Sequence, residues 1–167
     1  MAQTSRIAVR VESDLTSALD LVTAASELDS NTRIDLASGT GLGQADMQWS
    51  DRRTLAASAT EDLDLAGSLT GPIGTTLTFA RIKAVLIKAA AANTNDVQLT
   101  RPASNGAPLF LAAGDGLAVK PGGLFLWVAP NAAGVAVTEA TGDLLTLTNS
   151  AGSTSVTYDV IVIGASA

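Results

Sequence analysis

The sequence of 167 residues contains no cysteine and no histidine. Without cysteine there is no disulfide framework and no thiolate chemistry, and the redox compartment cannot be inferred from thiols. Without histidine, Ser-His-Asp and Cys-His nucleophilic machinery and the usual zinc sites are excluded, as is the side chain that titrates most readily near neutral pH. Enzymes can still be built from carboxylates and lysines, but this composition argues against catalysis.

Charged residues are also scarce, at 16% of the chain against about 25% in an average soluble domain. They comprise 10 basic and 16 acidic residues, a net charge of -6, which argues against a nucleic-acid binder that neutralises phosphates. Apolar residues make up 47% of the chain, much of it alanine, and low charge with many apolar residues favours a large interface with other subunits. The N-terminus has no basic and apolar secretory pattern, and no run approaches the ~18 apolar residues of a membrane helix. We therefore expect no membrane partner.

The clearest structural signal is the stretch Val119–Pro130. Pro121 presets φ for the second position of a tight turn, and Gly122 can adopt the positive φ that the third position of a type II turn requires. The five apolar residues of Leu124–Val128 then predict a buried strand. We expect its partners in one core to be strands at Phe79–Lys88 and Tyr158–Ile163.

The chain from residue 31 to residue 167 reads as a series of short strands separated by Gly, Pro and Asn turns. Further strands are expected at Arg33–Ala37, Ala45–Leu55, Glu61–Ala66, Val97–Thr100, Leu109–Ala112, Leu117–Val119, Val135–Glu139 and Leu144–Thr148. A strand roughly every 8 to 12 residues, with little helical periodicity, predicts an all-β fold. The expected architecture is a β-sandwich, jelly-roll-like, although the pattern does not separate a jelly roll from an immunoglobulin-like sandwich.

Residues 1–30 are expected to form an N-terminal arm or a helix. Ser13 or Asp14 could cap a helix over residues 14–28. Its apolar stripe would consist of Leu15, Leu19, Val22, Ala25 and Leu28. The alternative is extended, since the alternation of apolar and polar residues at Arg6–Val11, and nearly so at Ala18–Thr23, fits half-buried strands. Such an arm could add to the sheet of a neighbouring subunit.

Two residue clusters resemble ligand sites. Gly39, Gly41 and Gly43 suggest a phosphate loop, but the spacing is Gly-x-Gly-x-Gly, and neither a βαβ unit nor a Walker lysine follows, so the sequence favours a plain loop. Glu61, Asp62 and Asp64, with Asp115 from another loop, offer oxygen ligands of the kind that calcium takes. No EF-hand pattern accompanies them, and solvated strand faces explain these acids. We therefore expect no metal and no cofactor.

Two alternative functions rest on specific side chains. A carboxylate-based hydrolase would require two acids to converge in a cleft with at least one raised pKa. The candidate acids are Asp51, Glu61, Asp62, Asp64, Asp115 and Asp143. An adhesin or glycan-binding module would require an exposed aromatic platform, for which Trp49, between Gln48 and Ser50, is the candidate. Trp127 lies within an apolar run and is expected in the core.

Several segments together resemble a group of tailed-bacteriophage virion proteins of the kind that decorate or cement the head. These segments are Asp51–Ser58, Glu61–Gly67, Leu77–Lys83, Pro121–Trp127, Thr141–Leu145 and Val156–Gly164. Each one is a turn plus a strand, and their order and spacing carry the resemblance, which covers residues 35 to 167.

The resemblance implies a structural virion protein that binds and stabilises a capsid, and it brings no catalytic residues. It also implies that the protein binds the major capsid protein, is located on the capsid surface after synthesis in the host cytoplasm, and forms a homo-oligomer, which we expect to be a trimer. A rigid sandwich with free edge strands can bury apolar surface against a repeating lattice without any cofactor. The tail-associated or vertex adhesin remains the alternative.

Overall fold

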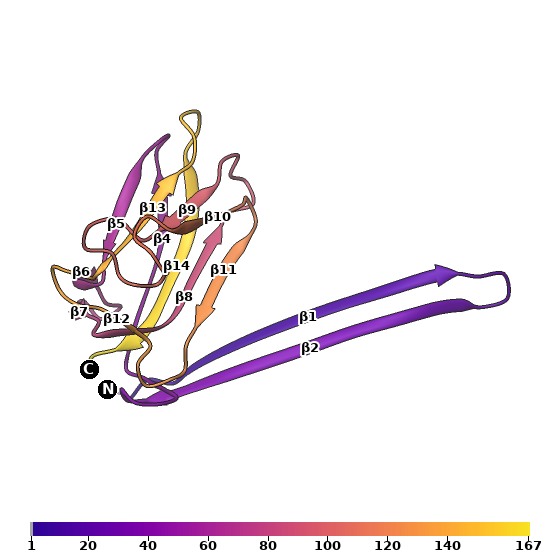
Figure 1. The fold of residues 1–167 in the computed structure, drawn as a ribbon, viewed down its shortest axis with the longest axis horizontal. Coiled ribbons are helices and arrows are strands. Elements are labelled where there is room, and N and C mark those ends of the chain that lie inside the picture. Colours follow the sequence, from indigo (N-terminus) through magenta and orange to yellow (C-terminus); the bar gives the residue numbers. More distant parts are fainter. Residues whose placement is uncertain (1) are drawn as a thin grey trace.

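The computed structural model describes residues 2–167, which form a β-sandwich and a long hairpin arm (Figure 1). The described residues contain strands and no α-helix, so the expected all-β class and the sandwich are confirmed. Within this part of the chain, no helix is long and apolar enough to cross a bilayer.

The sandwich consists of two antiparallel sheets, which we name the front sheet and the back sheet. The front sheet has the order β11-β8-β14-β4, with β12 also paired to β8. Its strands are β4 (Met47–Leu55), β8 (Arg81–Ala89), β11 (Leu124–Val128), β12 (Val135–Ala136) and β14 (Val156–Ala165). The back sheet has the order β10-β9-β13-β5. Its strands are β5 (Thr60–Asp64), β9 (Val97–Thr100), β10 (Gly116–Val119) and β13 (Leu144–Asn149).

The core lies between the two sheets because successive side chains of each strand point to opposite faces. On β14, the buried side chains Val160 and Val162 alternate with the outward-facing Ile161 and Ile163. β13 alternates in the same way and contributes Leu147 to the core. Each sheet therefore buries one face against the other and leaves its second face to solvent.

The arm is a hairpin of β1 (Ser5–Ala18) and β2 (Thr23–Ser38), paired without interruption along its whole length. The amide of Leu19 donates to the carbonyl of Val22 at 2.8 Å and closes the turn. The helical alternative for residues 14–28 is wrong, because the apolar residues that are spaced like a helix stripe lie on two strands and in the turn that joins them. The extended alternative is confirmed at Arg6–Val11, whereas Ala18–Thr23 forms the turn of the hairpin.

The stretch Val119–Pro130 is predicted correctly in shape and wrongly in burial. The amide of Gly123 donates to the carbonyl of Lys120 at 2.8 Å, and Gly122 has φ 74°, as a type II turn requires. β11 follows and pairs with β8, which also pairs with β14, so the expected partners are confirmed. However, β11 is an edge strand and Leu124 is 63% exposed, because the second layer covers only the inner face of this sheet.

Other expected strands are corrected by the structure. Leu109–Ala112 is an irregular loop rather than a strand, and only Val135–Ala136 of the expected Val135–Glu139 forms one. Three short strands were not expected: β3 (Gln44–Ala45), β6 (Ala66–Thr70) and β7 (Thr76–Thr78). β3 pairs in parallel with the end of β2, so it joins the arm to the sandwich.

Lys83 fastens the root of the arm to the sandwich. Its side chain is fully buried, and its ammonium group donates to the carbonyl oxygens of Ala132 at 2.8 Å, Gly41 at 3.4 Å and Asn131. Burial, together with the charge of Arg81, lowers the pKa of Lys83. Because Gly41 belongs to the loop after β2 and the other carbonyls belong to the loop before β12, one side chain holds the two loops together.

Gly134 in that second loop provides a test of the arm root. It has φ 56°, and a Cβ atom there would overlap the carbonyl oxygen of Ile82, whereas Gly43 has φ 64° with no atom within 4 Å of its Cβ position. Gly43→Ala is therefore expected to lower the free energy of unfolding by about 1 kcal/mol, for the backbone strain alone. Gly134→Ala adds a collision between the new Cβ atom and the backbone, and it is expected to lower the free energy of unfolding by about 3 kcal/mol. Denaturant unfolding of both variants measures this difference, and equal losses would contradict it.

Candidate interaction surface

The arm is an amphipathic ribbon whose two faces differ sharply in charge. Cross-strand pairs share a face, and the register places Ile7 opposite Ile34 and Leu15 opposite Ser26. One face, which we name the apolar arm face, carries only apolar and small hydroxyl residues. From Ile7 to Ser17 and from Ala24 to Ile34 its members are Ile7, Val9, Val11, Ser13, Leu15, Ser17, Ala24, Ser26, Leu28, Ser30, Thr32 and Ile34. The other face carries all the charged residues of the two strands.

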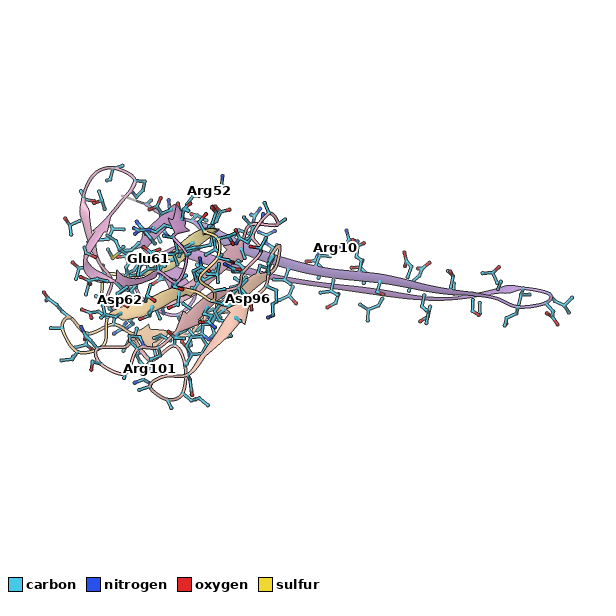
Figure 2. All side chains as sticks on the ribbon, turned by 90° about the horizontal axis from the view of Figure 1, so that it is seen from above. Arg10, Arg52, Glu61, Asp62, Asp96 and Arg101 are labelled. Atoms are coloured by element: carbon cyan, nitrogen blue, oxygen red, sulfur yellow. The ribbon has the colours of Figure 1, made fainter. Side chains whose placement is uncertain are left out.

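The apolar arm face is exposed beyond its root, whereas at the root Ile7 and Val9 line a pocket together with residues of the front sheet. Leu15 is 70% exposed, and Val9, Val11 and Leu28 are exposed as well. Figure 2 shows the side chains standing off both faces of the arm beyond Arg10, away from the sandwich. An isolated two-stranded hairpin is marginally stable at best in water, and the distal arm of this chain is a hairpin of this kind.

The charges of the arm are divided along its length. Near the root, Arg10 pairs with Glu12 at 2.6 Å and with Asp29 at 3.0 Å. Arg33 and Arg6 both bind the carboxylate of Asp35 and lower its pKa. Between residues 11 and 32 there are five acids and no basic residue. These five acids are Glu12, Asp14, Asp20, Glu27 and Asp29. The rest of the chain has a net charge of only -1, the difference between -6 and -5.

The outer face of the front sheet is a second apolar surface. Register places Leu126, Leu86 and Ile161 in one row across β11, β8 and β14. The neighbouring row holds Val128, Ala84 and Ile163. Leu124 is exposed beside the first row, and Ile161 is 37% exposed. No other element of the sandwich covers these residues as the back sheet covers the inner face.

The root of the arm runs beside this surface and forms a groove with it, which we name the arm groove. Its volume is about 690 Å³. One wall is the segment Arg6–Arg10 of β1, and the floor is the outer face of the front sheet, with Ala84, Leu86, Leu126 and Ile161. The guanidinium groups of Arg6 and Arg10 are already paired with acids of the arm. The groove is therefore chiefly apolar and open to a ligand with an apolar face.

A polar network bridges the two sheets at their other edge. Glu61 of β5 accepts a hydrogen bond from the hydroxyl group of Tyr158 and pairs with Arg53 of β4 at 2.9 Å. Arg53 also pairs with Asp51 at 3.1 Å, and its guanidinium lies over the ring of Trp49. Burial raises the pKa of Tyr158 far above 10, and the hydrogen bond to Glu61 and the charge of Glu61 add to this effect. This network joins the edge strands and leaves no free general base.

Tyr158 is the only tyrosine, so its ionisation can be followed by absorbance without interference from another tyrosine. The folded protein is expected to show no tyrosinate signal at about pH 11, whereas the denatured chain should titrate near pH 10. Because the unfolded state loses this proton above about pH 10 and the folded state keeps it, the free energy of unfolding should fall by about 1.4 kcal/mol per pH unit there. In Tyr158→Phe, the free energy of unfolding should no longer show this decrease above about pH 10. A folded protein that titrates near pH 10 would contradict the buried network.

The other candidate acids are dispersed and have local partners. Asp62 accepts from the hydroxyl of Thr146 at 2.6 Å, Asp64 from the amide of Ala66 at 2.9 Å, and Asp115 from the amide of Ala112 at 2.9 Å. Asp143 is buried and accepts from the amide of Ala140 at 2.8 Å. Residues 2–167 contain no group of three or more acids that could hold a metal ion.

The candidate residues for a glycan platform and for a phosphate loop both have structural positions. Trp49 is only 4% exposed and belongs to the core, so the expectation of an exposed aromatic platform is wrong. The polar neighbours Gln48 and Ser50 suggested an exposed position for Trp49. They occupy the outer face of β4, whereas Trp49 occupies the inner face. Gly39, Gly41 and Gly43 lie in the turn between β2 and β3, where the side chain of Gln44 accepts from the amide of Gly41 at 2.9 Å.

No protein-family model, no curated protein and no solved structure matches this chain. The function is therefore argued from the arm and the surfaces described above. The sequence did contain the signal for the apolar arm face, since uncharged residues occupy every second position on either side of residues 19–22. The register of the hairpin, which only the structure supplies, shows that these positions share one face.

Proposed function

We propose that this protein is a structural subunit of a tailed-bacteriophage virion that binds the capsid shell and stabilises it. The observation that carries the proposal is the arm, a hairpin of two strands whose apolar face is exposed over most of its length. Exposed contiguous apolar surface is typical of a protein that functions within an assembly. The resemblance of residues 35–167 to head decoration and cement proteins supplies the kind of assembly, with the major capsid protein as partner.

We propose further that the sandwich is a jelly roll. The first and last strands of the sandwich, β4 and β14, pair with each other. Moving inward along the chain, β5 pairs with β13, β8 with β11, and β9 with β10. This nested pairing is what a single long hairpin produces when it is rolled into two four-stranded sheets, and it supports a jelly roll over an immunoglobulin-like sandwich.

A role without catalysis agrees with the dispersal of the acids, each of which is already bound to a neighbouring group. The alternative of a glycan-binding adhesin loses its main support, because Trp49 is buried in the core. The capsid-binding role therefore fits the surfaces of this molecule better than either alternative.

The isolated protein is expected to be an oligomer, and we predict a trimer at tens of micromolar. Replacing Glu12–Asp29 with Asn-Gly keeps the root of the hairpin and closes it with a two-residue turn. This variant should be a monomer, because it lacks most of the apolar arm face, and its sandwich should still unfold cooperatively, at a midpoint no higher than that of the oligomeric full chain. Light scattering gives the mass and circular dichroism gives the unfolding midpoint. A full-length chain that is monomeric at this concentration would contradict the prediction.

In purified virions, the protein is expected in hundreds of copies per particle, as decoration of a repeating shell requires. Quantitative mass spectrometry against the major capsid protein measures this ratio. A handful of copies would instead indicate a part of the vertex or the tail, and absence from the particle would overturn the proposed function.

A further inference from the structure

We propose that the arm groove receives the arm of a second copy of this chain, so that subunits are joined by arm exchange. This inference rests on the proposed function only in that the arm acts between subunits. The two surfaces that lack partners, the apolar arm face and the outer face of the front sheet, would then cover each other.

The floor of the groove has the shape and chemistry that a β-ribbon requires. Its two apolar rows run across β11, β8 and β14. The row that holds Leu86 lies between the row of Ala84 and the row of Lys88. Both this floor and the apolar arm face are flat sheet surfaces without charge, and two such surfaces pack face to face at about 10 Å. The pairing needs no cofactor and no change in either fold.

The chain's own arm does not fill the groove. Only its root segment, Arg6–Arg10, lines the groove, and beyond it the arm leads away from the sandwich (Figures 1 and 2). Lys83 and the parallel pairing of β2 with β3 hold this root in place. Leu15 lies five residues beyond Arg10, about 17 Å farther along the ribbon. A neighbouring subunit can therefore bring its arm to the groove without displacing this one.

The distribution of charge favours an arm on a sandwich over an arm on another arm. Of the five acids of each distal arm, Glu12 and Asp29 are paired with Arg10. The charges of the other three acids, Asp14, Asp20 and Glu27, make arms placed together repel one another. The row next to the apolar floor holds Arg52, Asp159 and Lys88 across β4, β14 and β8. Arg52 pairs with Asp159 at 2.6 Å and lowers its pKa, which leaves the charge of Lys88 as the surplus of this row. The receiving surface is thus slightly basic, whereas the incoming ribbon is acidic.

The area supports a closed assembly rather than a single contact. A two-stranded ribbon about 10 Å wide laid along the roughly 30 Å of β8 covers about 300 Å² on each partner. One such contact buries about 600 Å² in total, less than the 1,200 Å² or more of a typical stable interface. In a ring or a reciprocal exchange, each subunit gives one arm and receives another, so it takes part in two contacts. A reciprocal exchange between two subunits places both contacts in one interface and reaches about 1,200 Å², whereas each interface of a ring or of an open chain keeps about 600 Å².

The absence of cysteine makes thiol cross-linking a direct test, with a short bismaleimide in place of a disulfide because facing sheets lie about 10 Å apart. Leu15→Cys on the arm of one tagged protein is mixed with Leu86→Cys on the floor of a second protein that carries a different tag. A third protein with Gln98→Cys, on the outer face of the back sheet, is the matched control for a half-buried strand position. With the bismaleimide, Leu15→Cys should link to Leu86→Cys about ten-fold faster than to Gln98→Cys, because docking raises the local concentration of the two thiols.

Each other outcome would overturn the proposal. Links between two Leu15→Cys chains alone would place arm against arm, equal rates with both partners would indicate random collision, and no links would leave the groove without an arm. Unfolding midpoints confirm that each variant folds, and Leu126→Cys, in the same row as Leu86, replaces Leu86→Cys if that variant does not. This test can fail independently of the proposed virion role. If the protein is present in high copy number in particles but these links do not form, arm exchange is wrong and the proposal of capsid binding still stands.

Discussion

A β-sheet removes an apolar face from water only where a second layer covers it. In this protein the front and back sheets cover each other, and their inner side chains form one continuous core. Two further apolar sheet faces, on the arm and on the outside of the front sheet, are left without a cover in the single chain. The proposals for assembly and for arm exchange both follow from this unmet requirement.

Hydrogen bonds and strand pairing hold the root of the arm to the sandwich. Lys83 binds carbonyl groups of two loops, β2 continues into a parallel pair with β3, and the amide of Gly43 donates to the carbonyl of Pro130 at 2.8 Å. A buried ammonium is costly unless its hydrogen bonds are satisfied, and here carbonyl oxygens satisfy them. These contacts fix the root of the arm to the sandwich, so that under the proposed arm exchange a neighbouring subunit would meet a preformed ribbon.

The polar groups of the sandwich serve its construction. Tyr158, Glu61 and Arg53 connect the edge strands of the two sheets, and the raised pKa of Tyr158 results from the same burial that makes the network stable. Perturbed groups often mark active sites, but here the hydroxyl group of Tyr158 is bonded to Glu61, and Glu61 is in turn paired with Arg53. The distal arm carries nearly all of the net negative charge of the chain, and charge of this kind influences association.

The sequence by itself determined the all-β class, most strand positions and the turn at Pro121 and Gly122, because alternation and turn chemistry are local properties. It left residues 14–28 undecided, since Leu15, Leu19, Val22 and Leu28 fit both a helix stripe and a hairpin with a turn between its strands. The exposure of β11, the burial of Trp49 and the arm groove depended on which face the second sheet covers. Only the tertiary structure decided these features, because burial is a property of layers packed together and no single strand records it.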